Sequence, residues 1–331
     1  MPRPYHSGAP SDHFDGMRFF NPDHPSTDKS LHDLLRWRRQ ERVRGAWPAV
    51  PPLPVAQDVP PAAIAGGIRV SMVGHATVLI QFKGLNILTD PVWSQRASPL
   101  PLLGPRRFTP PGIAFDALPP IHAVLISHNH YDHLDLPTLK RLWRAHRPRV
   151  IAPLGNDAVI RRKVPQIPVE TGDWGARFAL SDEVCAVIHP ANHWSARTLR
   201  DRRLALWGGF VLETGEGPVY FVGDTGYGSG EVFRAVRRAF GPPCLAIIPI
   251  GAYEPRWFMA PQHVDPREAV RILEDTGAAQ ALGIHFGTFR LTDEAQDAPL
   301  HALRAALDAA GLPHARFRPL SPGEVWQAPP R

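Results

Sequence analysis

The sequence predicts an α/β protein built from two mixed β-sheets that pack together, with helices on the outside. Two observations lead to this fold class. From residue 68 to residue 89, short β-type segments follow one another as in hairpins, and after residue 120 apolar strands alternate with helical patterns. Each such sheet must bury one face against another layer. With 44% hydrophobic residues among 331, the chain can build a core of that size.

Residues 1–60 are expected to form an N-terminal extension that packs on, or links to, a folded domain at residues 61–331. The extension contains one helical candidate, Leu31 to Arg44, in which leucines lie beside five arginines. Such a segment can bind an anionic membrane surface. Because charge runs of this kind are more often solvated helix faces, we favour the solvated interpretation. The proline-rich stretch from Pro48 to Pro61 predicts a connector.

The folded domain is expected to begin with strands at Ile68 to Val73, Thr77 to Phe82 and Leu85 to Thr89. The Lys83-Gly84 pair favours a tight turn that joins the last two as a hairpin. Further strands are expected at His122 to Ser127, Val150 to Ala152, Val184 to His189, Leu206 to Thr214, Val219 to Val222 and Leu245 to Ile250. Helices are expected at Leu136 to His146, Asn156 to Lys163, Glu231 to Phe240, Pro266 to Asp275 and Ala295 to Ala310. Asp135 and Asp265 are the capping residues expected for two of these helices.

The formal charge of +6 favours anionic partners, such as phosphates, a membrane surface or nucleic acid, although a solvated arginine surface would explain it equally well. Cys185 and Cys244 lie in apolar strands without a nearby second cysteine, so we expect both to be core residues. The chain has neither an apolar signal core at its N-terminus nor a run of about 20 apolar residues. These features predict a cytoplasmic protein whose contact with lipid, if any, is peripheral.

A cluster of polar residues follows the apolar run Ala123 to Ile126. It contains His128, His130, Asp132 and His133 within six residues. An H-x-H-x-D-H pattern directly after a buried strand is typical of a metal site and much less typical of a histidine-rich surface loop. Imidazole nitrogens and a carboxylate suit zinc, with iron or manganese as weaker candidates. The first two histidines can face one ion, and the last two residues can face a second.

Three more candidate ligands follow apolar runs elsewhere in the chain. His193 comes after the strand that ends near Ile188, Asp224 follows Val219 to Gly223, and His285 follows Ala281 to Ile284. Each signal is weak alone, because a histidine at a strand end is usually structural and a Gly-Asp-Thr-Gly segment is usually a turn. Their joint occurrence predicts that they converge on the His128 loop.

This order of residues resembles the metallo-β-lactamase superfamily, an αββα sandwich of hydrolases that carry one or two metals. Within that superfamily it is most similar to the N-acyl-phosphatidylethanolamine-hydrolysing phospholipase D group. The narrower resemblance covers roughly residues 68 to 290. Besides the metal loop, it rests on Gly74-His75-Ala76-Thr77, Leu88 to Ser94, Asn192-His193-Trp194, Gly223 to Tyr227, Tyr253 to Met259, Gln262 to Pro266 and Ile284 to Phe289.

The resemblance implies that residues 61–331 form a catalytic domain with five imidazoles and two carboxylates around two zinc ions. One ion would be held by His128, His130 and His193, the other by Asp132, His133 and His285, and Asp224 would bridge both together with a water or hydroxide. Asp90 resembles a carboxylate that orients a ligand imidazole, although a simple Asp-Pro turn is an equal alternative.

The resemblance further implies hydrolysis of a phosphodiester by metal-activated hydroxide, with phosphatidic acid and an N-acylethanolamine as products. Asp132 and Asp224 are candidate proton acceptors, weakened by metal ligation. His263, just before a helix N-terminus, is the candidate catalytic group outside the metal ligands, and a structural histidine is the alternative. Gln262, Arg256 and Trp257 are candidate substrate contacts; a buried Trp-Phe-Met segment beneath an ordinary surface arginine explains the last two equally well.

Other functions are compatible with the same metal ligands. A lactonase acting on sugar phosphates is the main alternative. A metal-dependent ribonuclease is less favoured, because we find no inserted module with clustered lysine, arginine and aromatic residues that would grip RNA. A non-enzymatic metal-binding protein is disfavoured because all seven ligand positions are filled. The expected partner is a phospholipid or another small phosphate-containing substrate, and the oligomeric state is left open.

Overall fold

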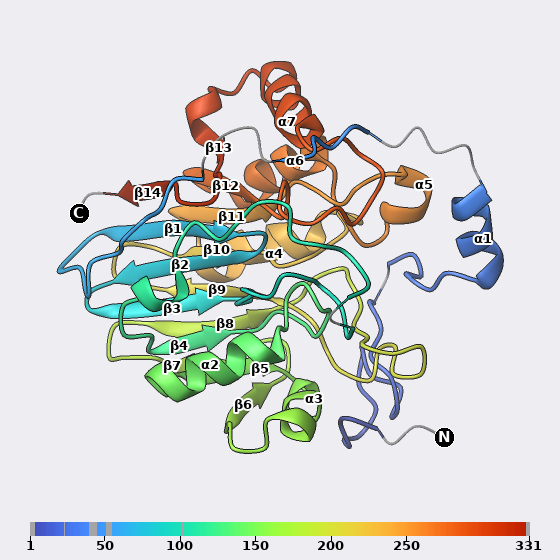
Figure 1. The fold of residues 1–331 in the computed structure, drawn as a ribbon, viewed down its shortest axis with the longest axis horizontal. Helices are drawn as coiled ribbons and strands as arrows, with labels where there is room; N and C mark the ends of the chain where they lie inside the picture. The colour runs from blue at the N-terminus through green and yellow to red at the C-terminus, as the bar shows by residue number, and fades with distance from the viewer. Residues whose placement is uncertain (1–3, 23, 40–44, 51–54, 101, 329–331) are drawn as a thin grey trace.

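The computed structural model describes residues 4–22, 24–39, 45–50, 55–100 and 102–328. In these residues two seven-stranded sheets pack face to face (Figure 1). In spatial order the first sheet contains β14 (Val325–Ala328), β1 (Ile68–Gly74), β2 (Thr77–Phe82), β3 (Leu85–Thr89), β4 (Ala123–Leu125), β5 (Arg149–Pro153) and β6 (Val169–Gly172). The second contains β13 (Phe317–Pro319), β12 (Gln280–Ile284), β11 (Leu245–Pro249), β10 (Val219–Phe221), β9 (Gly209–Glu213), β8 (Cys185–His189) and β7 (Arg177–Ala179).

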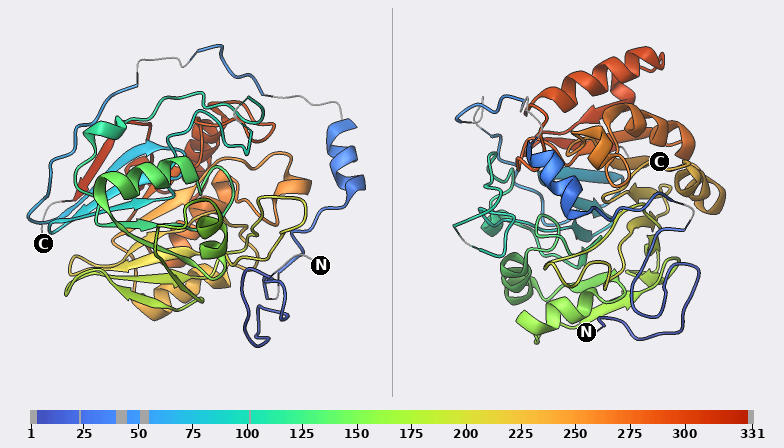
Figure 2. Two further views of the ribbon diagram at one scale, coloured as in Figure 1. Left: turned by 60° about the horizontal axis from the view of Figure 1, so that its bottom comes forward. Right: turned by 90° about the vertical axis from the view of Figure 1, so that its right-hand side faces the viewer.

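Helices cover the outer faces of both sheets, so the predicted αββα sandwich is confirmed (Figure 2). The helices are α1 (Leu31–Arg39), α2 (Leu136–His146), α3 (Asn156–Lys163), α4 (Glu231–Phe240), α5 (Arg256–Met259), α6 (Pro266–Thr276) and α7 (Ala298–Ala309), with two 3₁₀ turns, η1 (Phe115–Ala117) and η2 (His314–Arg316). α2 and α3 pack on the first sheet, and α4, α6 and α7 pack on the second.

The alternation of side chains along each strand explains the layers. On β1, Ile68, Val70 and Met72 point into the core between the sheets, whereas Val73 points into the core beneath the first pair of helices. Successive strand residues face opposite sides, so a strand buried on both faces reads as a continuous apolar run. This is why the central strands were recognisable in the sequence.

Most predicted elements are confirmed within one to three residues at each end. β2 and β3 pair antiparallel through the predicted turn at Lys83-Gly84. The Asp135 side chain caps α2 by accepting from the Thr138 N–H, and Asp265 forms a capping box with Glu268 at the start of α6.

Several local predictions are wrong or incomplete. The short strands β6, β7, β13 and β14 were not predicted because they contain few consecutive apolar residues. The last long helix begins at Ala298 and not at Ala295, because Pro299 is favourable in the first turn but in a helix begun at Ala295 would clash with the carbonyl of that residue. Cys185 and Cys244 are only partly buried, so the prediction that both are core residues is wrong.

The first part of the N-terminal extension, up to α1, lies on the right-hand side of Figure 1, and its described residues after α1 cross the top of the molecule toward the left. Phe14 and Phe19 are buried against Leu206 and Trp207 of the folded domain. The predicted helix is observed as α1, and its expected continuation over residues 40–44 lies outside the described residues. Among the described residues no helix has the length and hydropathy required to cross a bilayer.

Candidate metal centre

The loops that follow β4, β8, β10 and β12 meet at one edge of the sandwich, toward the viewer in the right panel of Figure 2. Each loop brings one or more of the predicted ligands, and the structure places all seven close together. Their candidate metal-binding atoms form overlapping groups in which every atom lies within 4.8 Å of the others. The strand ends provide a rigid base for these loops, because the strands are buried on both faces.

His128, His130 and His193 form the first cluster. The Nδ1 atom of His130 lies 2.8 Å from Nε2 of His128 and 3.3 Å from Nε2 of His193. The other ring nitrogen of His193 donates to the Gln262 carbonyl oxygen at 2.9 Å, which fixes Nε2 toward its neighbours. Three ring nitrogens that face one another at these distances suit one tetrahedral metal with three protein ligands.

Asp132, His133 and His285 form the second cluster, and His75 joins them. Nε2 of His133 lies 3.2 Å from Nε2 of His285, and both nitrogens are 3.5 Å from Oδ2 of Asp132. These atoms come from two loops more than 140 residues apart in the sequence, after β4 and β12. The structure therefore brings together the three residues predicted for the second site, and it adds His75, which the sequence analysis did not name as a candidate ligand.

Asp224 lies between the two clusters. Its Oδ2 atom is 3.1 Å from Nε2 of His133 and 3.2 Å from Nε2 of His285 in the second cluster, and 3.8 Å from Nε2 of His193 in the first. Oδ1 of Asp224 is buried without a hydrogen-bond partner among the described residues. A carboxylate in this position fits a ligand shared by two ions.

Asp90 lies behind the second cluster at the end of β3. Its Oδ2 accepts from Nδ1 of His133 at 2.7 Å and from the Ser127 hydroxyl at 2.6 Å, while Oδ1 accepts the Ser127 backbone N–H. The imidazole of His133 is thereby turned so that Nε2 faces the cluster. This is the geometry expected of a carboxylate that orients a metal ligand.

The electrostatics of the site fit a pair of cations. Burial by itself raises the pKa of the Asp132 and Asp224 carboxyls, yet the surrounding histidines hold both well below their ordinary values. Burial likewise lowers the pKa of His285, but Asp224 and Asp132 outweigh it and raise that pKa to about 9. Asp90 adds a third buried carboxyl. The carboxylates thus favour positive charge at this place, which two divalent cations would supply.

The first cluster differs in its charge. Burial lowers the pKa of His130 and His193 to about 3, so both rings are neutral at physiological pH. Neutral imidazole is the form that binds a metal, so this cluster needs no deprotonation to accept one.

His263 and Gln262 line the same site. Nδ1 of His263 is 3.9 Å from Oδ2 of Asp224 and has no hydrogen-bond partner among the described residues, and Oε1 of Gln262 is likewise buried without one. Burial lowers the pKa of His263 to about 3, so the ring is a neutral donor or acceptor at physiological pH. Gln262 has a second role that the sequence did not suggest, because its carbonyl orients His193.

Arg256 and Trp257 are engaged in contacts with the protein itself. The Arg256 guanidinium donates to the Glu268 carboxylate at 2.7 Å and to the His263 carbonyl at 2.8 Å. The Trp257 ring is covered by the guanidinium of Arg36, 4.4 Å from the ring centroid. Arg256 therefore holds the turn that carries His263, and the predicted direct contact of either residue with substrate has no support in these interactions.

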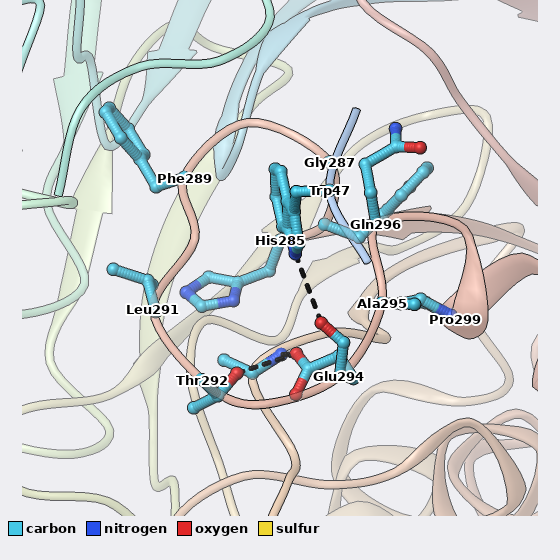
Figure 3. A pocket seen from close by; sticks show the side chains of 12 residues that line it. Trp47, His285, Gly287, Phe289, Leu291, Thr292, Glu294, Ala295, Gln296 and Pro299 are labelled. Carbon is cyan, nitrogen blue, oxygen red and sulfur yellow. Dashed lines mark hydrogen bonds between the residues drawn. The ribbon is translucent and has the colours of Figure 1, made fainter. Parts of the chain in front are cut away.

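A small pocket lies behind His285 and joins the extension to the site (Figure 3). The indole of Trp47 donates to the Glu294 carbonyl at 3.1 Å, and Thr292 donates to the Glu294 carboxylate at 2.7 Å. Further back along the extension, Asn21 donates to the carbonyl of His193 at 2.8 Å. The extension thus contacts the loops of two predicted metal ligands, which the sequence did not indicate.

Comparisons with known proteins agree with this site. A family model described as "Beta-lactamase superfamily domain" matches residues 85–286. The chain is 36% identical over 276 residues to the N-acyl-phosphatidylethanolamine-hydrolyzing phospholipase D 1 of Caenorhabditis elegans, which covers 80% of this chain and 77% of that protein. It is also 36% identical over 217 residues to the mitochondrial N-acyl-phosphatidylethanolamine-hydrolyzing phospholipase D of Saccharomyces cerevisiae, covering 64% of this chain and 46% of that protein.

The fold is shared with solved structures of much lower identity. Igni18, a metallo hydrolase from the archaeon Ignicoccus hospitalis, superposes with a TM-score of 0.59 at 17% identity, over 80% of this chain and 99% of that one. The family match, the two relatives and the convergent histidines and aspartates lead to one conclusion. The chain belongs to the metallo-β-lactamase superfamily and is a metal-dependent hydrolase.

Proposed function

We propose that the protein is a two-zinc phosphodiesterase that hydrolyses N-acyl-phosphatidylethanolamine, or a related phospholipid, in the manner of a phospholipase D. The observation that carries this proposal is the position of Asp224 between two histidine clusters. Five imidazoles and two carboxylates are a ligand set that suits zinc, with iron or manganese as the alternatives. The substrate class is supported by the names of the two phospholipase D relatives.

Two zinc ions held by these residues would lower the pKa of a bound water and would offset negative charge on a phosphoryl group. The chain's own residues would hold these ions and orient the ligand side chains around them. Asp90 and the Gln262 carbonyl fix the imidazoles of His133 and His193. His263, whose Nδ1 lies 3.9 Å from Asp224, would donate a hydrogen bond to a phosphoryl or leaving oxygen. Asp132 and Asp224 are near enough to accept a proton, but both face the ligand histidines, so we assign no separate general base.

The test is an assay of the purified, zinc-loaded protein with N-acylated phosphatidylethanolamine and with a bis-aryl phosphodiester. We expect cleavage of both, and from the lipid the release of phosphatidic acid and an N-acylethanolamine, detected by mass spectrometry. Release of diacylglycerol would show that a different bond breaks. Rapid opening of a sugar-phosphate lactone with no cleavage of either phosphodiester would overturn the proposal in favour of a lactonase.

We also propose that the metal-site edge lies on an anionic lipid surface during catalysis. Three segments expose leucines there: Leu31 on α1 is 79% exposed, Leu102 is 82% exposed and Leu199 is fully exposed. α1 lies against α5, with the Trp37 ring 4.8 Å from Phe258. The loops near Leu102 and Leu199 border one cavity of about 690 Å³ together with Tyr131 of the metal loop. Burying apolar side chains in the interface and pairing nearby arginines with anionic lipids both favour such binding.

The lipid contact predicts that Leu31→Glu combined with Leu199→Glu weakens binding to anionic vesicles by about 100-fold or more, since each buried leucine contributes roughly 1.5–3 kcal/mol. Vesicle flotation measures the bound fraction. Val59→Glu is the matched control, because Val59 is 76% exposed but lies outside the three segments. Equal flotation of the double variant and the control would contradict the proposed contact. The double variant should cleave the water-soluble bis-aryl phosphodiester at the wild-type rate.

A further inference from the structure

We propose that His75 is a positioning residue for the second metal site, where it holds both Asp132 and His285 in place. This inference rests on the proposed two-metal site and adds an eighth residue to its seven ligands. Nε2 of His75 lies 2.9 Å from Oδ2 of Asp132. The His75 ring centroid is 3.9 Å from that of His285, and the His75 carbonyl oxygen accepts the His285 backbone N–H at 2.9 Å. One residue therefore contacts two of the three ligands of this site.

The backbone around His75 is arranged to deliver the ring into the site. The register between β1 and β2 shifts between Met72 and Gly74, which re-aims the residues at the end of β1. His75 itself has a φ of +59°, a left-handed conformation that is unfavourable for a residue with a Cβ atom. Non-glycine residues kept in this region cluster at functional sites, because the surrounding contacts must hold them there. Here the Thr288 hydroxyl oxygen accepts the His75 N–H at 3.0 Å.

The ring is fixed as firmly as the backbone. His75 is 1% exposed, and Phe289 meets it edge to face with the ring centroids 5.2 Å apart. The guanidinium of Arg107 lies over the Phe289 ring, 4.8 Å from its centroid. The loop after His285 thus contacts both the backbone of His75, through Thr288, and its ring, through Phe289. A small displacement of this ring would move Asp132 and His285 together.

The distances indicate that His75 acts as a hydrogen-bond donor to Asp132. Its separation of 2.9 Å from the carboxylate oxygen is that of a donated N–H···O bond. His133 and His285 lie 3.5 Å from the same oxygen, as expected for ligands of one ion that do not bond to each other. A proton on Nε2 leaves Nδ1 bare, and Nδ1 has no partner among the described residues. A hydrogen-bond donor to a ligating carboxylate keeps the free lone pair of that carboxylate directed toward the metal.

The test measures metal binding and not turnover. Apoprotein and its variants are titrated with Zn²⁺ in competition with a chromophoric chelator, and Co²⁺ loading is followed by visible absorption. For His75→Ala we expect the affinity of one site to fall by about 10–100-fold, the range seen when a partner of a metal ligand is removed, while the other site is unchanged. His75→Gln should recover part of this loss, because its amide can donate to Asp132. His189→Gln is the control, since His189 is a buried histidine that bonds the Val232 carbonyl away from the site.

Each outcome has a clear meaning. Wild-type affinity at both sites in His75→Ala would overturn the inference, and so would equal losses in both sites with a folded apoprotein by circular dichroism. If His75→Ala does not fold, the comparison uses His75→Gln and His75→Asn. The inference then requires that His75→Gln, which has the longer side chain, binds the second ion more tightly than His75→Asn does. A wild-type protein that binds fewer than two ions would instead count against the proposed two-metal site.

Discussion

Asp224→Ala is expected to lose metal and phosphodiesterase activity together, with a fall in kcat of about 10³-fold or more. The expected fall is large because this carboxylate lies close to histidines of both clusters, so in the proposed two-metal site its removal would affect both ions at once. A single preorganised contact to the reacting group contributes about 10²–10³ in kcat, and here the loss of charge compensation for His133 and His285 is added. Elemental analysis gives the zinc content and the bis-aryl phosphodiester assay gives the rate.

Two comparisons make this result specific. Asp224→Asn keeps the shape and one oxygen but removes the charge, so we expect weaker metal binding than in the wild type and stronger binding than in Asp224→Ala. His130→Ala removes a ligand of the first cluster only, and metal and activity should again fall together. Retention of both zinc ions in Asp224→Ala would disprove the bridging role of this residue.

His263→Ala is expected to lower kcat by about 10²–10³-fold while both metal ions stay bound. His263 faces Asp224 from 3.9 Å, and its Nδ1 has no hydrogen-bond partner among the described residues, so it is available to the substrate. Loss of one donor to a developing charge typically has an effect of this size. Because the ring is neutral when its pKa is held near 3, we expect it to donate a hydrogen bond and not to act as a cation.

The measurements separate this role from a structural one. His263→Gln should recover part of the rate, because its amide can also donate, and KM should change less than kcat in both variants. Loss of zinc from His263→Ala would instead show that His263 is a metal ligand, as its place in a group with His193 and Asp224 permits.

The sequence by itself determined the layers of the fold and the identity of the candidate ligands. Buried strands such as β4 and β11 appear as apolar runs, and the capping residues Asp135 and Asp265 mark two helix starts because their side chains act within one turn. Edge strands such as β6 and β7 are held mainly by pairing with a neighbour, which leaves little trace in the local pattern. The ligands were found because each follows a strand and their order is that of a known superfamily.

Apart from Asp90, which the resemblance suggested, only the tertiary structure decided which groups support these ligands. The hydrogen bond from His75 to Asp132 joins residues 57 positions apart, and the one from His193 to the Gln262 carbonyl joins residues 69 positions apart. The arginine proposed to meet the substrate, Arg256, is bound by Glu268 and the His263 carbonyl. Such partners depend on how loops from distant strands meet, and a backbone carbonyl oxygen is present at every position of a sequence. Residue type and order therefore indicated the candidate ligands and Asp90, whereas the contacts of His75 and of the Gln262 carbonyl were revealed by distance alone.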